Sequence, residues 1–175
     1  LFAPIPDHPM SGFPVELCSK LSMVVKPLDN FAIVLGIDPP FLISVEKALL
    51  IVSGLHDQKQ LRTYQQKLDT MQQHFERSVT VSKSNDYEKA QALFMSLWEK
   101  KPNRYNGDFL LAKVIDNQLD EDKDKKVGNC VGLTSLYSVL GVRLGLDVAV
   151  LCSEDHVLSL LSYSGQKIVV ENTLP

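Results

Sequence analysis

Apolar residues recur at three- and four-residue spacing through the middle of the chain, a pattern typical of helices with one buried face. Ser44 is a candidate N-cap for a first helix that ends at Gly54. A long second helix is predicted from a narrow apolar stripe at residues Leu61, Tyr64, Leu68, Met71 and Phe75.

Two further helices complete this part of the chain. Asn85 and Glu88 have the spacing of a capping box and predict the start of a third helix, which ends at Pro102. Asp108 predicts the start of a fourth helix, because periodic apolar residues follow it. Residues 43–119 are therefore predicted to form a helical part.

A buried helix is predicted immediately after Gly128 and Asn129. Gly145 stands where a helix usually ends, and Cys130 is predicted to lie in the first turn. The apolar positions of this helix, at three- and four-residue spacing, are Cys130, Leu133, Leu136, Tyr137, Leu140 and Leu144.

Three apolar or β-branched runs follow this helix, at residues 147–152, 157–163 and 168–170. Ser164 and Gly165 form a predicted turn between the last two runs, so the three are expected to build an antiparallel sheet. The predicted fold class is therefore α+β, with a helical N-terminal half followed by a Cys-bearing helix packed on an antiparallel sheet.

The composition fits one globular domain over residues 1–175, with 45% hydrophobic and 22% charged residues. Seven of the nine prolines fall before residue 41, so residues 1–42 are predicted to form a proline-rich extended arm or short irregular pieces. Residues 128–175, which hold the Cys130 helix and the sheet, are expected to form a core that is cut short at its C-terminus. The chain does not begin with Met, and it ends two residues after Thr173.

Charge and cysteine content exclude several partners. The net charge of −3, without a basic run, argues against nucleic acid, and no apolar stretch is long enough to cross a membrane. Three cysteines, an odd number without CxxC spacing, indicate a reducing compartment, so we expect the protein in the cytoplasm. No Cys or His pair has metal-ligand spacing, and no metal or cofactor is expected.

The strongest chemical signal is a thiol at a helix start with an imidazole downstream. Free backbone N–H groups and the helix dipole favour a thiolate at Cys130, and His156 follows within reach as a base. The competing interpretation is that Cys130 is a small buried apolar residue. Cys18 and Cys152 are interpreted as structural, the second because it lies inside an apolar strand.

A third member of the site would orient the imidazole, and the turn length decides between two residues. A two-residue turn at Ser164 and Gly165 puts His156 opposite Thr173 and on the face of Glu171. A three-residue loop would instead bring Asn172 opposite His156. We favour Glu171 and keep Asn172 as the alternative.

Three segments resemble the transglutaminase-like superfamily of papain-type folds: GNCVGLTSLYSVLGVRLGL (128–146), EDHVLSLL (154–161) and VVENT (169–173). The family has a Cys at a helix start, a His on the next strand but one and an Asp on the strand after it. The resemblance implies that Cys130 is a nucleophile and His156 its base. Glu171 falls where the Asp is expected, and Asn172 is a substitute of the kind that papain-like enzymes use.

The function that the resemblance implies is cysteine-dependent acyl transfer or hydrolysis on an amide or peptide bond through a thioester. The protein would then be a protease, an amidase or an amine acyltransferase with a peptide or protein substrate and no cofactor. The segment Ser153 to His156 also resembles menin, which has this fold without the chemistry. The alternative is therefore an inactive protein-binding or scaffold module, whose helical repeats can continue beyond this chain.

The charged run at residues 120–126, DEDKDKK, imitates the first positions of a calcium loop. Lys125 stands where such a loop needs Gly, and Val131 stands where it needs Glu, so a calcium site is rejected. We expect a solvated loop that borders the approach to Cys130.

Overall fold

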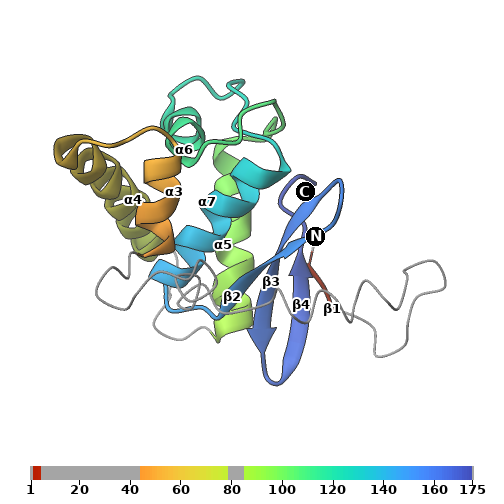
Figure 1. Ribbon diagram of the computed structural model, residues 1–175. Helices are drawn as coiled ribbons and strands as arrows, with labels where there is room; N and C mark the ends of the chain where they lie inside the picture. Colours follow the sequence, from red (N-terminus) through yellow and green to blue (C-terminus); the bar gives the residue numbers. More distant parts are fainter. Residues whose placement is uncertain (1, 5–43, 79–84, 175) are drawn as a thin grey trace.

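The computed structural model describes residues 2–4, 44–78 and 85–174, which form an α+β fold. The predicted arm at 1–42 lies outside these residues except for 2–4. The helices in this part of the chain, drawn in Figure 1, are α3 (Val45–Val52), α4 (Gln58–Ser78), α5 (Asp86–Lys100), α6 (Leu111–Leu119) and α7 (Cys130–Arg143).

The predicted N-caps of α3 and α5 are present in the structure. The Ser44 side chain accepts a hydrogen bond from the Lys47 N–H at 3.2 Å, which satisfies one of the free donors of α3. Asn85 and Glu88 make the reciprocal capping box of α5. The stripe of α4 is buried at Leu61, Leu68 and Phe75, as its spacing predicts.

The prediction for the start of α6 is wrong by three residues. This helix begins at Leu111 behind Leu110, which makes no side-chain cap. Asp108 makes other contacts: its backbone oxygen accepts from the Asn129 N–H, and its carboxylate accepts from the Asn117 amide of α6. A residue that could cap a helix instead stabilises a neighbouring loop.

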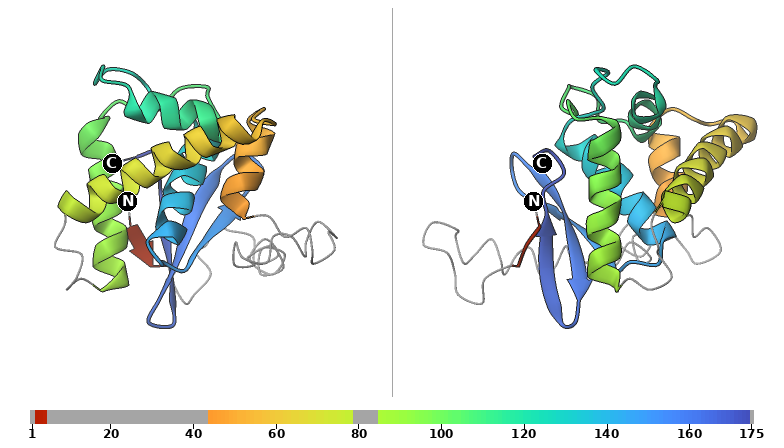
Figure 2. Two further views of the ribbon diagram at one scale, coloured as in Figure 1. Left: turned by 90° about the vertical axis from the view of Figure 1, so that its left-hand side faces the viewer. Right: turned by 180° about the vertical axis from the view of Figure 1, so that it is seen from behind.

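Helix α7 runs through the middle of the molecule, with the sheet on one side and α3 and α4 on the other (Figures 1 and 2). Its side chains are buried around almost the whole circumference, as expected for a central helix that packs against several elements. The helix starts at Cys130, as predicted, and Gly145, with φ +78°, follows its end in the conformation that glycine adopts most easily.

The sheet is antiparallel, with the order β1-β4-β3-β2. Ser164 and Gly165, with φ 49° and 78°, form a two-residue turn between β3 and β4. Tyr163 pairs with Gln166 on either side of it, and Ser159 pairs with Val170, so the two-residue register is confirmed. The strands are β1 (Phe2–Pro4), β2 (Val148–Cys152), β3 (Val157–Tyr163) and β4 (Gln166–Val170).

Two helices are tied to the C-terminal end of α7 by one arginine. Arg143 donates from Nε and Nη2 to the Glu46 carboxylate of α3, at 2.5 and 3.0 Å, and from Nη1 to Asp69 of α4, at 2.6 Å. Arg143 and Glu46 are largely buried, so this paired contact is stronger than a solvent-exposed ion pair. It fixes α7 relative to the helical half of the chain.

Candidate functional site

Cys130 is the first residue of α7 and is partly accessible. The side chain of Asn129 accepts a hydrogen bond from the Gly132 N–H at 3.1 Å and caps the helix. Within the described residues, the N–H groups of Cys130 and Val131 have no acceptor. They form an electropositive helix end beside the thiol, which can stabilise a negative oxygen.

The segment before Cys130 is held by the loop at 104–108. The N–H groups of Val127 and Gly128 both donate to the Arg104 oxygen, at 2.7 and 3.0 Å. The Asn129 N–H donates to the Asp108 oxygen at 2.7 Å, and the Gly128 oxygen accepts from an N–H of the same loop at 3.1 Å. These bonds fix the direction in which the chain enters α7.

A side-chain network supports this loop, and the sequence reasoning missed it. The Asn117 amide donates to the Asp108 carboxylate at 2.8 Å and to the Val127 oxygen at 3.0 Å. Asn106 accepts from the Asp108 N–H at 2.8 Å, which makes a local turn. The Asn-Gly-Asp sequence at 106–108 was the available signal, because these residues favour turns that bond to their own backbone.

Glycine is required at two positions by the close approach of this loop to α7. A Cβ on Gly128 would lie 2.8 Å from the Asp108 oxygen and 2.9 Å from the Val114 methyl group. A Cβ on Gly132 would lie 2.6 Å from that methyl group and 2.8 Å from the same oxygen. The two glycines on either side of Cys130 therefore allow backbone contact that any larger residue would prevent.

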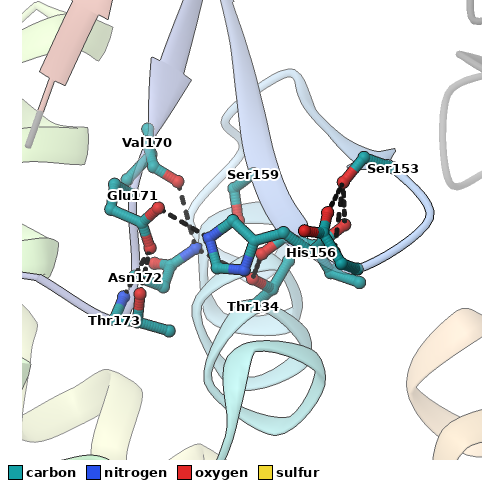
Figure 3. Close-up of polar contacts among 10 residues, drawn as sticks. Thr134, Ser153, His156, Ser159, Val170, Glu171, Asn172 and Thr173 are labelled. Carbon is teal, nitrogen blue, oxygen red and sulfur yellow. Dashed lines mark hydrogen bonds and ion pairs between the residues drawn. The ribbon is translucent and has the colours of Figure 1, made fainter.

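His156 and Glu171 point toward each other, as Figure 3 shows, with 2.7 Å between Nε2 and Oε2. They lie just beyond the paired ends of β3 and β4, where the register carries His156 opposite Thr173. Thr173 also donates to Glu171 from its N–H at 2.8 Å and from its hydroxyl at 2.5 Å. The carboxylate is thus held on three sides.

Burial alone would raise the pKa of Glu171, but the hydrogen bonds from Thr173 and His156 outweigh it and hold that pKa below its ordinary value. Glu171 is therefore ionised near neutral pH and only accepts hydrogen bonds. The His156 nitrogen that faces it, Nε2, must then carry a hydrogen. In the neutral ring this leaves the lone pair on Nδ1.

Asn172 makes a different set of contacts. It is buried, and its amide donates to Thr134 at 3.2 Å, to the Ser159 hydroxyl at 2.9 Å and to the Val170 oxygen at 3.3 Å. These bonds join the end of β4 to α7 and β3. Of the two residues left open by the sequence, Glu171 contacts the imidazole and Asn172 braces the sheet against the helix.

The packing of α7 on β3 brings Cys130 toward His156. Thr134 donates to the Val157 oxygen at 3.0 Å. One turn later in α7, Ser138 contacts Ser159 at 2.9 Å, so the two elements touch at successive turns of the helix. Thr134 lies one helical turn after Cys130, and Val157 directly follows His156, so both candidate residues adjoin this contact between helix and strand. In the described part of the chain, no hydrogen bond joins the Cys130 thiol to the imidazole.

The structural interpretation of Cys152 is not supported by its position. Cys152 is the last residue of β2, opposite Val157, and its side chain is exposed. Desolvation by neighbouring atoms raises the pKa of its thiol, and a charge on Cys130 raises it further, so the two cysteines lie within range of each other's charge. Cys18, the other cysteine interpreted as structural, lies outside the described residues.

The charged loop at 120–126 is exposed along its length, as expected, and its Lys126 oxygen accepts from Asn106 at 3.2 Å. Buried Lys101 donates from Nζ to the backbone oxygens of Asp120 and Asp122. In the residues that the structure describes, no group of three or more His, Cys, Asp or Glu side chains is placed to hold a metal ion. No helix in this part of the chain combines the length and the apolar character needed to cross a bilayer.

Comparisons of the chain with protein-family models, with curated proteins and with solved structures found no match.

Proposed function

We propose that this protein is a cysteine-dependent enzyme that transfers or hydrolyses acyl groups of amides or peptides, with Cys130 as the nucleophile. The observation that carries the proposal is the 2.7 Å contact between His156 and Glu171 at the end of the sheet next to the start of α7. A carboxylate that holds one imidazole nitrogen leaves the other free as a base for a thiol. The order of these residues also resembles the transglutaminase-like superfamily.

The proposed reaction has two steps. His156 takes the Cys130 proton at Nδ1, the thiolate attacks the carbonyl carbon, and the ring returns the proton to the leaving amine. Water then attacks the thioester in a protease or amidase, and an amine does so in an acyltransferase. Both routes release free Cys130.

The backbone N–H groups of Cys130 and Val131 are the proposed oxyanion hole. They lack an acceptor within the described residues and lie beside the sulfur, where the carbonyl oxygen gains negative charge. Glu171 orients the ring and stabilises its protonated form. In this scheme the reaction needs no cofactor, and its substrate is a peptide or protein. The free thiol that it uses suits a reducing compartment such as the cytoplasm.

The second candidate is an inactive protein-binding or scaffold module of the same fold. The observation that favours it is the missing hydrogen bond, among the described residues, between the Cys130 thiol and His156. The Glu in place of the family's Asp points the same way. The two candidates differ in one measurable property, which is whether Cys130 can be acylated.

An activated ester tests this proposal without knowledge of the natural substrate. Reaction with p-nitrophenyl acetate should release one equivalent of p-nitrophenolate rapidly and leave an acetyl group on Cys130, located by peptide mass spectrometry. Cys130→Ser should remove the burst, His156→Ala should slow it, and Cys152→Ser should leave it unchanged. Acetylation of Cys130 no faster than that of Cys152 would overturn the enzyme and favour the binding module.

A further inference from the structure

One buried hydroxyl connects the helix that carries Cys130 to the strand that follows His156. Thr134 is 1% exposed and lies one helical turn after Cys130, on the same side of α7. Its hydroxyl donates to the Val157 oxygen at 3.0 Å, and Val157 directly follows His156 in the chain. A single side chain therefore links the backbone of the proposed nucleophile to that of the proposed base.

The start of β3 has fewer strand neighbours than its centre. The pairing between β3 and β4 starts at Ser159 and Val170, two residues after Val157. On its other side Val157 pairs with Cys152, the last residue of β2. Because strand ends with few neighbours open more easily than strand centres, the bond from Thr134 anchors this end of β3 to α7.

The same hydroxyl also reaches the segment of the third site residue. It accepts from the Asn172 amide at 3.2 Å (Figure 3), and Asn172 directly follows Glu171. The amide keeps two other acceptors, Ser159 and Val170, at 2.9 and 3.3 Å. Glu171 thus stays braced without Thr134, and the contact of Thr134 with Val157 is the one that bears on the distance between thiol and ring.

We propose that Thr134 is a positioning residue, whose hydrogen bond to Val157 keeps the His156 ring within reach of the Cys130 thiol. This inference rests on the proposed function, because it states how the nucleophile and the base of that site are kept together. A base takes a proton from a thiol only when the two groups are correctly placed, so a small shift of the start of β3 slows the reaction. The hydroxyl acts on the site through the backbone of Val157.

The test measures iodoacetamide labelling of Cys130 in the full chain with two substitutions of Thr134. Thr134→Val replaces the hydroxyl with a methyl group and should slow labelling at pH 6.5 about three- to tenfold, a factor that corresponds to the loss of one neutral hydrogen bond. The dependence of the rate on pH should move to higher pH, because a thiol without its base ionises later. Thr134→Ser keeps the hydroxyl and should retain the wild-type rate and pH dependence.

A double-mutant cycle separates positioning from a general loss of packing. In the His156→Ala protein, Thr134→Val should have no further effect on labelling, because the hydroxyl acts through the imidazole. Ser138→Ala is the matched control, since Ser138 is also buried, lies one turn further along α7 and contacts Ser159 of β3. Its labelling rate should equal that of the wild type, and urea unfolding shows that each variant is folded under the labelling conditions.

Three results would overturn the positioning role. They are a Thr134→Val rate equal to that of the wild type, a Thr134→Ser rate as low as that of Thr134→Val, and an equal loss with and without His156. If Thr134→Val does not fold, Thr134→Ala removes the same hydroxyl and takes its place in each comparison.

The outcome is separate from that of the proposed enzyme. If Thr134→Val slows labelling only when His156 is present, but p-nitrophenyl acetate does not acetylate Cys130, Thr134 positions a thiol and imidazole pair and the enzyme is rejected. If Cys130 is acetylated at the wild-type rate in Thr134→Val, the enzyme stands and the positioning role is rejected.

Discussion

Gly132→Ala adds one methyl group at the contact between α7 and the loop that holds Cys130. The new Cβ would lie 2.6 Å from a Val114 methyl group and 2.8 Å from the backbone oxygen of Asp108. Neither partner can move easily, because Val114 is a fully buried β-branched residue and the Asp108 oxygen already binds Asn129. The loop, the helix or both must shift.

Two effects of opposite sign set the size of the change in stability. Ala is favoured over Gly inside a helix by about 0.5–1 kcal/mol. Extra volume in a tightly packed contact costs about 1–3 kcal/mol, and here the clash involves backbone, so we take the upper half of that range. The net loss in the free energy of unfolding is then about 1–2.5 kcal/mol.

Urea unfolding followed by circular dichroism measures this loss as a lower midpoint at an unchanged slope. Gly107→Ala in the same loop is the control, because nothing lies within 4 Å of its new Cβ and its φ is not positive. Its stability should equal or exceed that of the wild type by up to about 1 kcal/mol. A Gly132→Ala protein as stable as the wild type would refute the close approach of loop and helix.

Three other substitutions test separate contacts. Asn172→Ala should lower the free energy of unfolding by about 1–3 kcal/mol in urea, because the buried hydroxyls of Thr134 and Ser159 each lose a donor. Iodoacetamide labelling of Cys130 should change little, and a large drop in labelling with intact stability would contradict this role. Arg143→Met should cost about 1–3 kcal/mol, since the partly buried carboxylate of Glu46 loses its cation, and an unchanged urea midpoint would refute it. Glu171→Gln should destabilise the protein by about 1 kcal/mol above pH 5. Because the folded-state pKa of Glu171 is lowered, this difference should shrink as the pH falls through that pKa, and a difference that grows in acid would be inconsistent with it.

The predictable parts of the fold depend on residues that are close in the sequence. The capping box of Asn85 and Glu88 and the Cys130 helix start follow from local hydrogen bonds and apolar spacing. The register that places His156 on the face of Glu171 follows from the two-residue turn, because the length of a hairpin turn determines which residues of its two strands pair. The contact between His156 and Glu171 could therefore be predicted from the sequence alone.

The missed features depend on contacts between distant segments. Asp108 looks like a helix cap, but its partners are Asn117 and Asn129, which only the folded chain brings to it. Cys152 looks buried because its strand is apolar, yet it lies at the strand end, where the sheet offers less cover. The role of Asn172 depends on Thr134 across the helix-sheet interface, which no spacing in the sequence reveals.

The most direct test of the site is the rate at which iodoacetamide labels Cys130 near pH 6.5, where only a thiolate reacts appreciably. We expect Cys130 to react at least about tenfold faster than Cys152, whose pKa is raised, and His156→Ala to remove most of this advantage. Glu171→Gln should reduce it in part. Equal labelling of Cys130 and Cys152, or a rate that is indifferent to His156, would contradict a nucleophile assisted by this imidazole.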